Sequence, residues 1–161
     1  MAGRVIQALR HSKLVPSLTE AELRVLANCG RIESFKPGET VIAAGGPDER
    51  LFVFLEGEVR LVISMWSEGG HCGGEAAFDL TTPGEAFGWA MWVRSDRITV
   101  AATARKTTTL VALDLNRLGD ATTLLKVSQR MVQLLYGRLQ EGGVCPPDVQ
   151  GLLKLQHFLH A

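Results

Sequence analysis

The sequence predicts an α+β protein that is mainly β: a jelly-roll β-barrel, or double-stranded β-helix, flanked by N-terminal helices and a long C-terminal helix. Three observations support this prediction. Apolar residues recur at helical spacing before residue 30. From residue 31 to 115, short runs of Val, Ile, Phe and Leu are interrupted by Gly and Pro about every 8–12 residues, which is typical of β-barrels. Helical spacing returns after Gly119.

Two helices are predicted within residues 2–30. Residues 2–12 place apolar side chains on one face of a helix. Thr19 and Glu22 form a capping-box pattern, in which the hydroxyl and the carboxylate each accept an amide hydrogen bond from the other residue. The second helix is therefore expected to begin after Thr19 and to end near Gly30. Its inward side chains are expected to be Leu23, Leu26 and Ala27.

The barrel is predicted over residues 31–115 and is expected to have eight strands. Gly57 separates two apolar runs and predicts a tight turn that needs a positive φ. The glycine-rich segment 69–74 is typical of a mobile hairpin tip. The candidate strands are residues 31–35, 40–43, 51–56, 58–64, 76–80, 98–104 and 108–114.

A long amphipathic helix is predicted over residues 121–140, and Gly142 and Gly143 end it. Residues 141–161 then form a short extension with a last helix over 148–160. We interpret residues 1–140 as one domain. Its chain length is enough to bury a real core.

The composition argues against several classes of protein. Of the 161 residues, 46% are hydrophobic and 21% are charged, as in an ordered globular protein. Seventeen Lys and Arg balance seventeen Asp and Glu, so the basic excess of a dedicated nucleic-acid-binding protein is absent. Three cysteines without C-x-x-C spacing favour a reducing cytoplasm. No apolar run is long enough for a membrane span.

Three segments carry a family resemblance: FKPGETVIAAGG at 35–46, LFVFLEGEVRLV at 51–62 and TPGEAFGWAMWVRSDRITVAATA at 82–104. Over residues 14–140 the chain resembles the cyclic-nucleotide-binding domains of catabolite activator protein-like regulators and of kinase regulatory subunits. The resemblance implies a cassette of strand, Gly-rich turn and helical turn that holds a sugar phosphate. The structural glycines of the family correspond to Gly38, Gly45, Gly57, Gly84 and Gly88.

The cassette positions that the resemblance implies as ligand-binding are Gly88, Trp89, Ala90, Arg97, Ile98 and Thr99. Backbone amides at a helix start bind an anion, so Gly88, Trp89 and Ala90 could supply them whatever their side chains are. An ungapped count from Gly88 places Ile98, and not Arg97, at the family's phosphate-binding Arg. Arg97 either is a solvated loop cation or reaches inward through a bulge, because one residue along a strand reverses the face.

Trp89 occupies the position at which the family has a Glu that accepts the ribose hydroxyl. An indole has no acceptor, and it is bulky enough to fill the ribose space. Two interpretations remain open. Trp89 fills the vacated pocket, or Trp89 and Trp92 form an aromatic wall for a different, planar ligand. Either way, we expect cyclic AMP and cyclic GMP to bind weakly or not at all.

Catalytic and metal sites are not predicted. The four histidines, His11, His71, His157 and His160, lack the H-x-H pattern of a cupin-like metalloenzyme, and no nucleophile motif is present. The resemblance implies a non-catalytic ligand-sensing or regulatory domain, without a cofactor, that binds an unknown small molecule or none. The first alternative is the effector part of a catabolite activator-like DNA-binding regulator. The second alternative is the cupin-like enzyme.

The expected partner is a second copy of the chain. The apolar positions of helix 121–140 exceed what one barrel face is expected to cover, and the family uses this helix for a two-fold contact. About 20 residues follow Gly142, too few for a winged helix-turn-helix, so we expect no direct DNA binding by this chain unless it is part of a longer protein.

Overall fold

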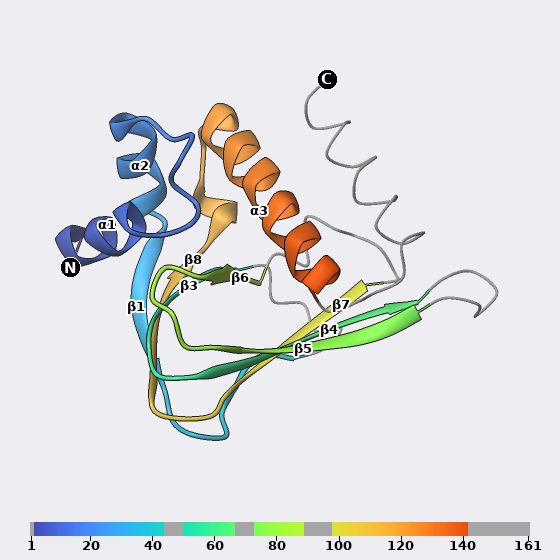
Figure 1. The fold of residues 1–161 in the computed structure, drawn as a ribbon. Coiled ribbons are helices and arrows are strands. Elements are labelled where there is room, and N and C mark those ends of the chain that lie inside the picture. Colours follow the sequence, from blue (N-terminus) through green and yellow to red (C-terminus); the bar gives the residue numbers. More distant parts are fainter. Residues whose placement is uncertain (1, 44–49, 67–72, 89–97, 142–161) are drawn as a thin grey trace.

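The computed structural model describes residues 2–43, 50–66, 73–88 and 98–141. Within them, the helices are α1 (Ala2–Arg10), α2 (Glu20–Ala27) and α3 (Ala121–Glu141), and a 3-10 turn spans Leu115–Arg117. The strands are β1 (Gly30–Phe35), β2 (Thr40–Ile42), β3 (Leu51–Glu56), β4 (Val59–Trp66), β5 (Gly73–Leu80), β6 (Ala86–Phe87), β7 (Ile98–Ala104) and β8 (Thr108–Leu113). Figure 1 shows the three helices gathered on one side of the strands.

The strands form two antiparallel sheets, as the predicted jelly roll requires. The first sheet has the order β1-β8-β3-β6, and the second has the order β2-β7-β4-β5. Consecutive strands alternate between the sheets, except that β4 and β5 form a hairpin within the second sheet. The mainly β fold with flanking helices is therefore confirmed.

The capping box of α2 is also confirmed. The Thr19 hydroxyl accepts a hydrogen bond from the Glu22 amide at 3.2 Å, and the Glu22 carboxylate accepts one from the Thr19 amide at 2.9 Å. The helix ends at Ala27, earlier than predicted, because Gly30 is already paired with Leu113 as the first residue of β1.

The structure differs from the sequence prediction at several strands. Both β4 and β5 are longer than expected, and Gly73 and Gly74 belong to β5 and not to a hairpin tip. The two-residue strand β6 was not predicted, because two residues are too few to show an alternating pattern. The rest of the expected tip, residues 67–72, and the expected helix 148–160 lie outside the described residues.

The core lies between the two sheets and extends under the helices. Its largest fully buried side chains include Phe52, Phe54, Phe87, Leu9, Leu26, Leu61, Ile63, Leu110 and Met131. The three side chains predicted to face inward from α2 are buried as expected. Among the described helices, none is long and apolar enough to cross a membrane.

Candidate functional site

The candidate site begins where β6 leads into Gly88. The strand is held by β3, with Phe87 opposite Phe52 and Ala86 opposite Val53. The rings of Phe52 and Phe87 stack with their centroids 5.5 Å apart, and both side chains are fully buried. Aromatic pairs at this separation add to the energy of apolar burial. The start of the cassette is therefore fixed by the barrel core itself.

Gly88 combines a positive φ of 89° with very close packing. A Cβ atom at this position would lie 2.8 Å from Cδ1 of Ile42, 2.9 Å from Cδ2 of Phe52 and 3.1 Å from the carbonyl oxygen of Arg50. Any larger residue would meet both backbone strain and a steric clash. Gly88 thus allows the chain to leave β6 directly against the core.

The structure describes only part of the predicted cassette. Gly88 and the start of β7 are placed, whereas Trp89, Ala90 and Arg97 lie outside the described residues. Ile98 begins β7 opposite Met65, and Thr99 pairs with Ser64 and is partly buried. The two described ends of the cassette belong to different sheets, with β6 in the first and β7 in the second.

A partly buried arginine beside Gly88 was not predicted from the sequence. Arg50 forms an ion pair with Glu33, with Nη1 and Oε2 2.6 Å apart, and its guanidinium lies 5.1 Å from the centre of the Phe52 ring. Its carbonyl oxygen is one of the three atoms closest to Gly88. The backbone of Arg50 therefore packs against the start of the cassette, while its guanidinium is paired with Glu33. A single Arg before a strand has no pattern that could have indicated this position.

A second charged group joins the start of the cassette to α3. The Glu85 carboxylate, immediately before β6, accepts from Nζ of Lys13 at 2.5 Å and from Nη2 of Arg138 at 2.6 Å. The Lys13 amide donates to the Gly84 carbonyl at 3.0 Å, and Nε of Arg130 donates to the Lys13 carbonyl at 2.7 Å. We call Lys13, Glu85, Arg130 and Arg138 the Glu85 junction.

Glu85 and Arg138 are the shielded members of the Glu85 junction, whereas the Lys13 side chain is 49% exposed. The side chains of Glu85 and Arg138 are only 15% and 13% exposed, and the Arg138 guanidinium lies 5.8 Å from the centre of the Phe78 ring. Charge-assisted hydrogen bonds are stronger than neutral ones, and more so away from water. The junction therefore couples the N-terminal segment, the cassette and α3 at one point.

The other end of α3 is attached to α2. Nζ of Lys126 lies 2.8 Å from Oε1 of Glu22, the same oxygen that accepts from the Thr19 amide. The hydrogen bond from Lys126, followed by that from the Thr19 amide, lowers the pKa of the Glu22 carboxyl below its usual value. The second oxygen, Oε2, is buried without a hydrogen-bond partner among the described residues.

The apolar stripe of α3 is largely used inside the chain. Val127, Met131 and Leu135 are buried in the core, and Leu124 and Leu134 pack against it. Among the described large hydrophobic residues, Leu125 is the one that is exposed, at 40%. Fewer apolar side chains of α3 are therefore left exposed for a partner than the sequence suggested.

The described residues include no group of three or more His, Cys, Asp or Glu that could hold a metal ion. Of the four histidines, only His11 is described, and it is exposed. Cys29 is a buried free cysteine, and burial raises the pKa of its thiol. A buried protonated thiol is a poor nucleophile, so nothing in this part of the chain indicates cysteine chemistry.

Known structures share the fold of this chain. The chain superposes on the Thermus thermophilus catabolite activator protein with 26% identity and a TM-score of 0.59, covering 81% of this chain and 59% of that one. It also superposes on the regulatory subunit of a cAMP-independent protein kinase A from Trypanosoma brucei, in a mutant form bound to cAMP in the A site. That match has 19% identity and a TM-score of 0.60, and covers 86% of this chain and 48% of that one.

A third similar structure is the sensor domain of the transcriptional regulator DNR from Pseudomonas aeruginosa, with 16% identity and a TM-score of 0.57. That match covers 84% of this chain and 91% of that one. The two matches below 25% identity support the fold alone. The chain spans only 59% and 48% of the first two proteins. No curated protein matches this chain in sequence.

The sequence model of the cyclic nucleotide-binding domain matches residues 32–122, which run from β1 to the beginning of α3. This segment contains both sheets, Gly88 and both ends of the cassette. The chain therefore belongs to the cyclic nucleotide-binding domain family.

Proposed function

We propose that this chain is a non-catalytic regulatory domain whose phosphate-binding cassette has lost, or changed, its nucleotide specificity. The observation that carries the proposal is the pair of residues at the charged positions of the family pattern, Trp89 in place of Glu and Ile98 in place of Arg. Each lost charged hydrogen bond at a buried site costs about 1.5–3 kcal/mol. Two losses weaken binding by roughly 10²–10⁴-fold.

The similar proteins are consistent with a domain of this kind. The T. brucei regulatory subunit belongs to a cAMP-independent kinase, and its cAMP-bound structure is that of a mutant. The P. aeruginosa protein is the sensor domain of a transcriptional regulator. From Trp89 and Ile98 we propose, for this chain, sensing of another small molecule, or a pocket that has lost its ligand, with no cofactor and no catalytic step.

Calorimetric titration with cyclic AMP and cyclic GMP tests the proposal. We expect no binding, or weak binding, to the natural chain and a gain in affinity for the Trp89→Glu/Ile98→Arg double variant. A Trp89→Leu/Ile98→Leu variant is the matched control, because it removes the indole without adding polar contacts. Low-micromolar affinity of the natural chain for either nucleotide contradicts the proposal.

We propose that the output of the domain is carried by α3 through the Glu85 junction. Glu85 immediately precedes β6, and its two cationic partners come from the N-terminal segment and from α3. A ligand that moves the start of the cassette must therefore either break or lengthen these ion pairs, or move Lys13 and Arg138 together with Glu85. Such a shared, discrete contact is a physical route for coupling two sites.

A homodimer through residues 121–140 remains part of the proposal, on a narrower basis than the sequence suggested. Leu135 is buried inside the chain, so replacing it would disrupt the fold and not a dimer alone. The exposed Leu125 is the better probe. We expect light scattering to give about twice 17.5 kDa and Leu125→Glu to reduce the mass. A monomeric mass at protein concentrations of tens of micromolar would contradict the proposed dimer.

The alternative is that the chain is the effector part of a DNA-binding regulator. It is favoured by one observation, the 59% of the T. thermophilus catabolite activator protein that this chain spans. A mobility-shift assay with the full-length gene product separates the alternatives: specific DNA binding supports the regulator, and its absence supports a stand-alone module.

A further inference from the structure

A pocket outside the cassette lies between α1 and the first sheet. It has a volume of about 460 Å³, within the range of small-molecule sites. One wall is the face of α1 that carries Arg4, Gln7 and Ala8, continued by His11. The opposite wall is the end of β3 and the turn before β6. The residues on that wall are Leu55, Glu56, Pro83 and Gly84.

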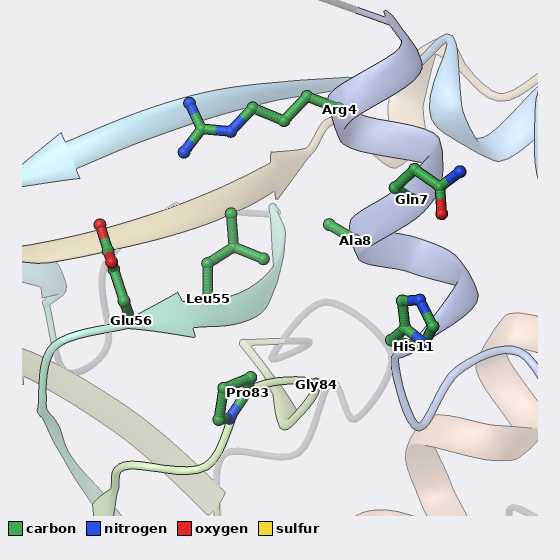
Figure 2. A pocket seen from close by; sticks show the side chains of 8 residues that line it. All are labelled: Arg4, Gln7, Ala8, His11, Leu55, Glu56, Pro83 and Gly84. Atoms are coloured by element: carbon green, nitrogen blue, oxygen red, sulfur yellow. The ribbon is translucent and has the colours of Figure 1, made fainter.

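The pocket has a charged end and an apolar middle. In Figure 2 the guanidinium of Arg4 and the carboxylate of Glu56 extend toward the same end, whereas His11 lies at the opposite end. Leu55 points between them, and Ala8 faces it from the helix. Leu55 and Ala8 are both partly buried and packed against the core. The pocket thus offers one cation and one anion beside an apolar surface.

Arg4 and Glu56 are both exposed residues, and neither charge is neutralised within the described part of the chain. Within the described part of the chain, Arg4 and Glu56 form no ion pair with each other or with another residue, whereas Arg10, Lys13, Arg50, Lys126 and Arg138 all pair with carboxylates. Glu56 has one structural role, because its Oε1 accepts from the Thr109 hydroxyl at 3.2 Å. Its other oxygen is left for a ligand.

We propose that this pocket binds an α-amino acid with a large apolar side chain. The planar guanidinium of Arg4 suits a carboxylate, which it can hold through two parallel hydrogen bonds. The carboxylate of Glu56 accepts hydrogen bonds from an α-ammonium group. Ala8, Leu55 and Pro83 then contact the apolar side chain. A simple carboxylic acid would satisfy Arg4 but would place its charge near that of Glu56.

The pocket also touches the segment that carries the Glu85 junction. Gly84 lines the pocket, and its carbonyl accepts from the Lys13 amide. A Cβ on Gly84 would lie 2.6 Å from the carbonyl oxygen of His11, so the two walls of the pocket meet closely there. An amino acid bound between them would link α1 to this turn directly. The inference does not depend on what the cassette binds.

Calorimetry on the full chain tests the site with L-phenylalanine as the probe. Phenylpropionate, which lacks the amino group, and phenylethylamine, which lacks the carboxylate, are the comparison ligands. We expect L-phenylalanine to bind at least about tenfold more tightly than either, about 1.4 kcal/mol for each missing charged contact. Amide NMR shifts on binding should be centred on α1, Leu55, Glu56 and Gly84.

Three variants complete the experiment. Arg4→Gln and Glu56→Gln should each weaken L-phenylalanine binding about tenfold or more, and Glu56→Gln retains an oxygen for the Thr109 hydroxyl. Arg24→Gln is the matched control, because Arg24 is an exposed arginine of α2 outside the pocket, and it should bind as the natural chain does. The proposal is overturned if L-phenylalanine does not bind. It is also overturned if phenylpropionate binds equally well, or if the shifts lie elsewhere.

Discussion

Gly38, in the turn between β1 and β2, and Gly88, at the start of the cassette, have the same φ of 89°. Their surroundings are opposite. A Cβ on Gly38 would have nothing within 4 Å, whereas one on Gly88 would meet three atoms at 2.8–3.1 Å. The first glycine serves only the backbone, and the second also serves the packing.

This difference shows where the barrel has no spare room. At the β1–β2 turn, a side chain costs only the strain of the left-handed conformation. At Gly88, the chain lies against Ile42, Phe52 and Arg50, so the start of the cassette cannot widen without moving the core. Space for a ligand must therefore come from the residues that follow Gly88.

The largest expected effect is at the next residue, Trp89. If close packing continues there, the indole fills the nucleotide pocket, and Trp89→Ala costs about 3–5 kcal/mol of the free energy of unfolding. Thermal melting without ligand measures this loss, and Trp92→Ala provides a matched aromatic truncation. A drop of less than a couple of degrees for Trp89→Ala would favour an open ligand site walled by this side chain.

The next largest loss of stability is expected when the two glycines are replaced by alanine. Gly38→Ala should cost about 1–2 kcal/mol for the left-handed backbone. Gly88→Ala should carry the same strain and a further 1–3 kcal/mol or so for overpacking against the core. Urea unfolding of both variants gives the difference. Equal losses would mean that the core relaxes around the new methyl group, and the contrast between the two turns would disappear.

A smaller effect is expected at Glu85, which holds the same part of the chain from the other side. Glu85→Ala removes the acceptor of two charge-assisted hydrogen bonds and leaves Arg138, only 13% exposed, without its carboxylate. We expect a loss of about 1.5–3 kcal/mol in urea unfolding. Glu141→Ala is the control, because Glu141 is an exposed acid near the same group. Similar midpoints for the two variants would assign the junction no energetic role.

Much of the fold could be predicted from the sequence, because its signals are local. The spacing of apolar residues and the capping box of Thr19 and Glu22 predicted the helices, and the rhythm of Gly and Pro predicted the barrel. The positive φ of Gly57 was also predicted, from its place between two apolar runs.

The site was harder to predict because its contacts are distant in sequence. Glu85 meets residues 72 and 53 positions away, and Arg50 meets Glu33, 17 positions away. No spacing rule relates such residues. Gly38 and Gly88 have the same φ, and only the packing around them separates their roles. The roles of the residues that would decide the ligand, from Trp89 to Arg97, remain predictions.

The Glu85 junction has a further consequence for the order in which the chain folds. Its two ion pairs close loops of 72 and 53 residues, whereas the ion pair of Arg10 and Glu20 closes a loop of 10. Loop closure costs more entropy as the loop lengthens, so long-range contacts tend to form late. A contact that is absent from the transition state changes the unfolding rate and leaves the folding rate almost unchanged. The junction should therefore slow unfolding: without Glu85, the domain should fold at nearly its normal rate but unfold faster.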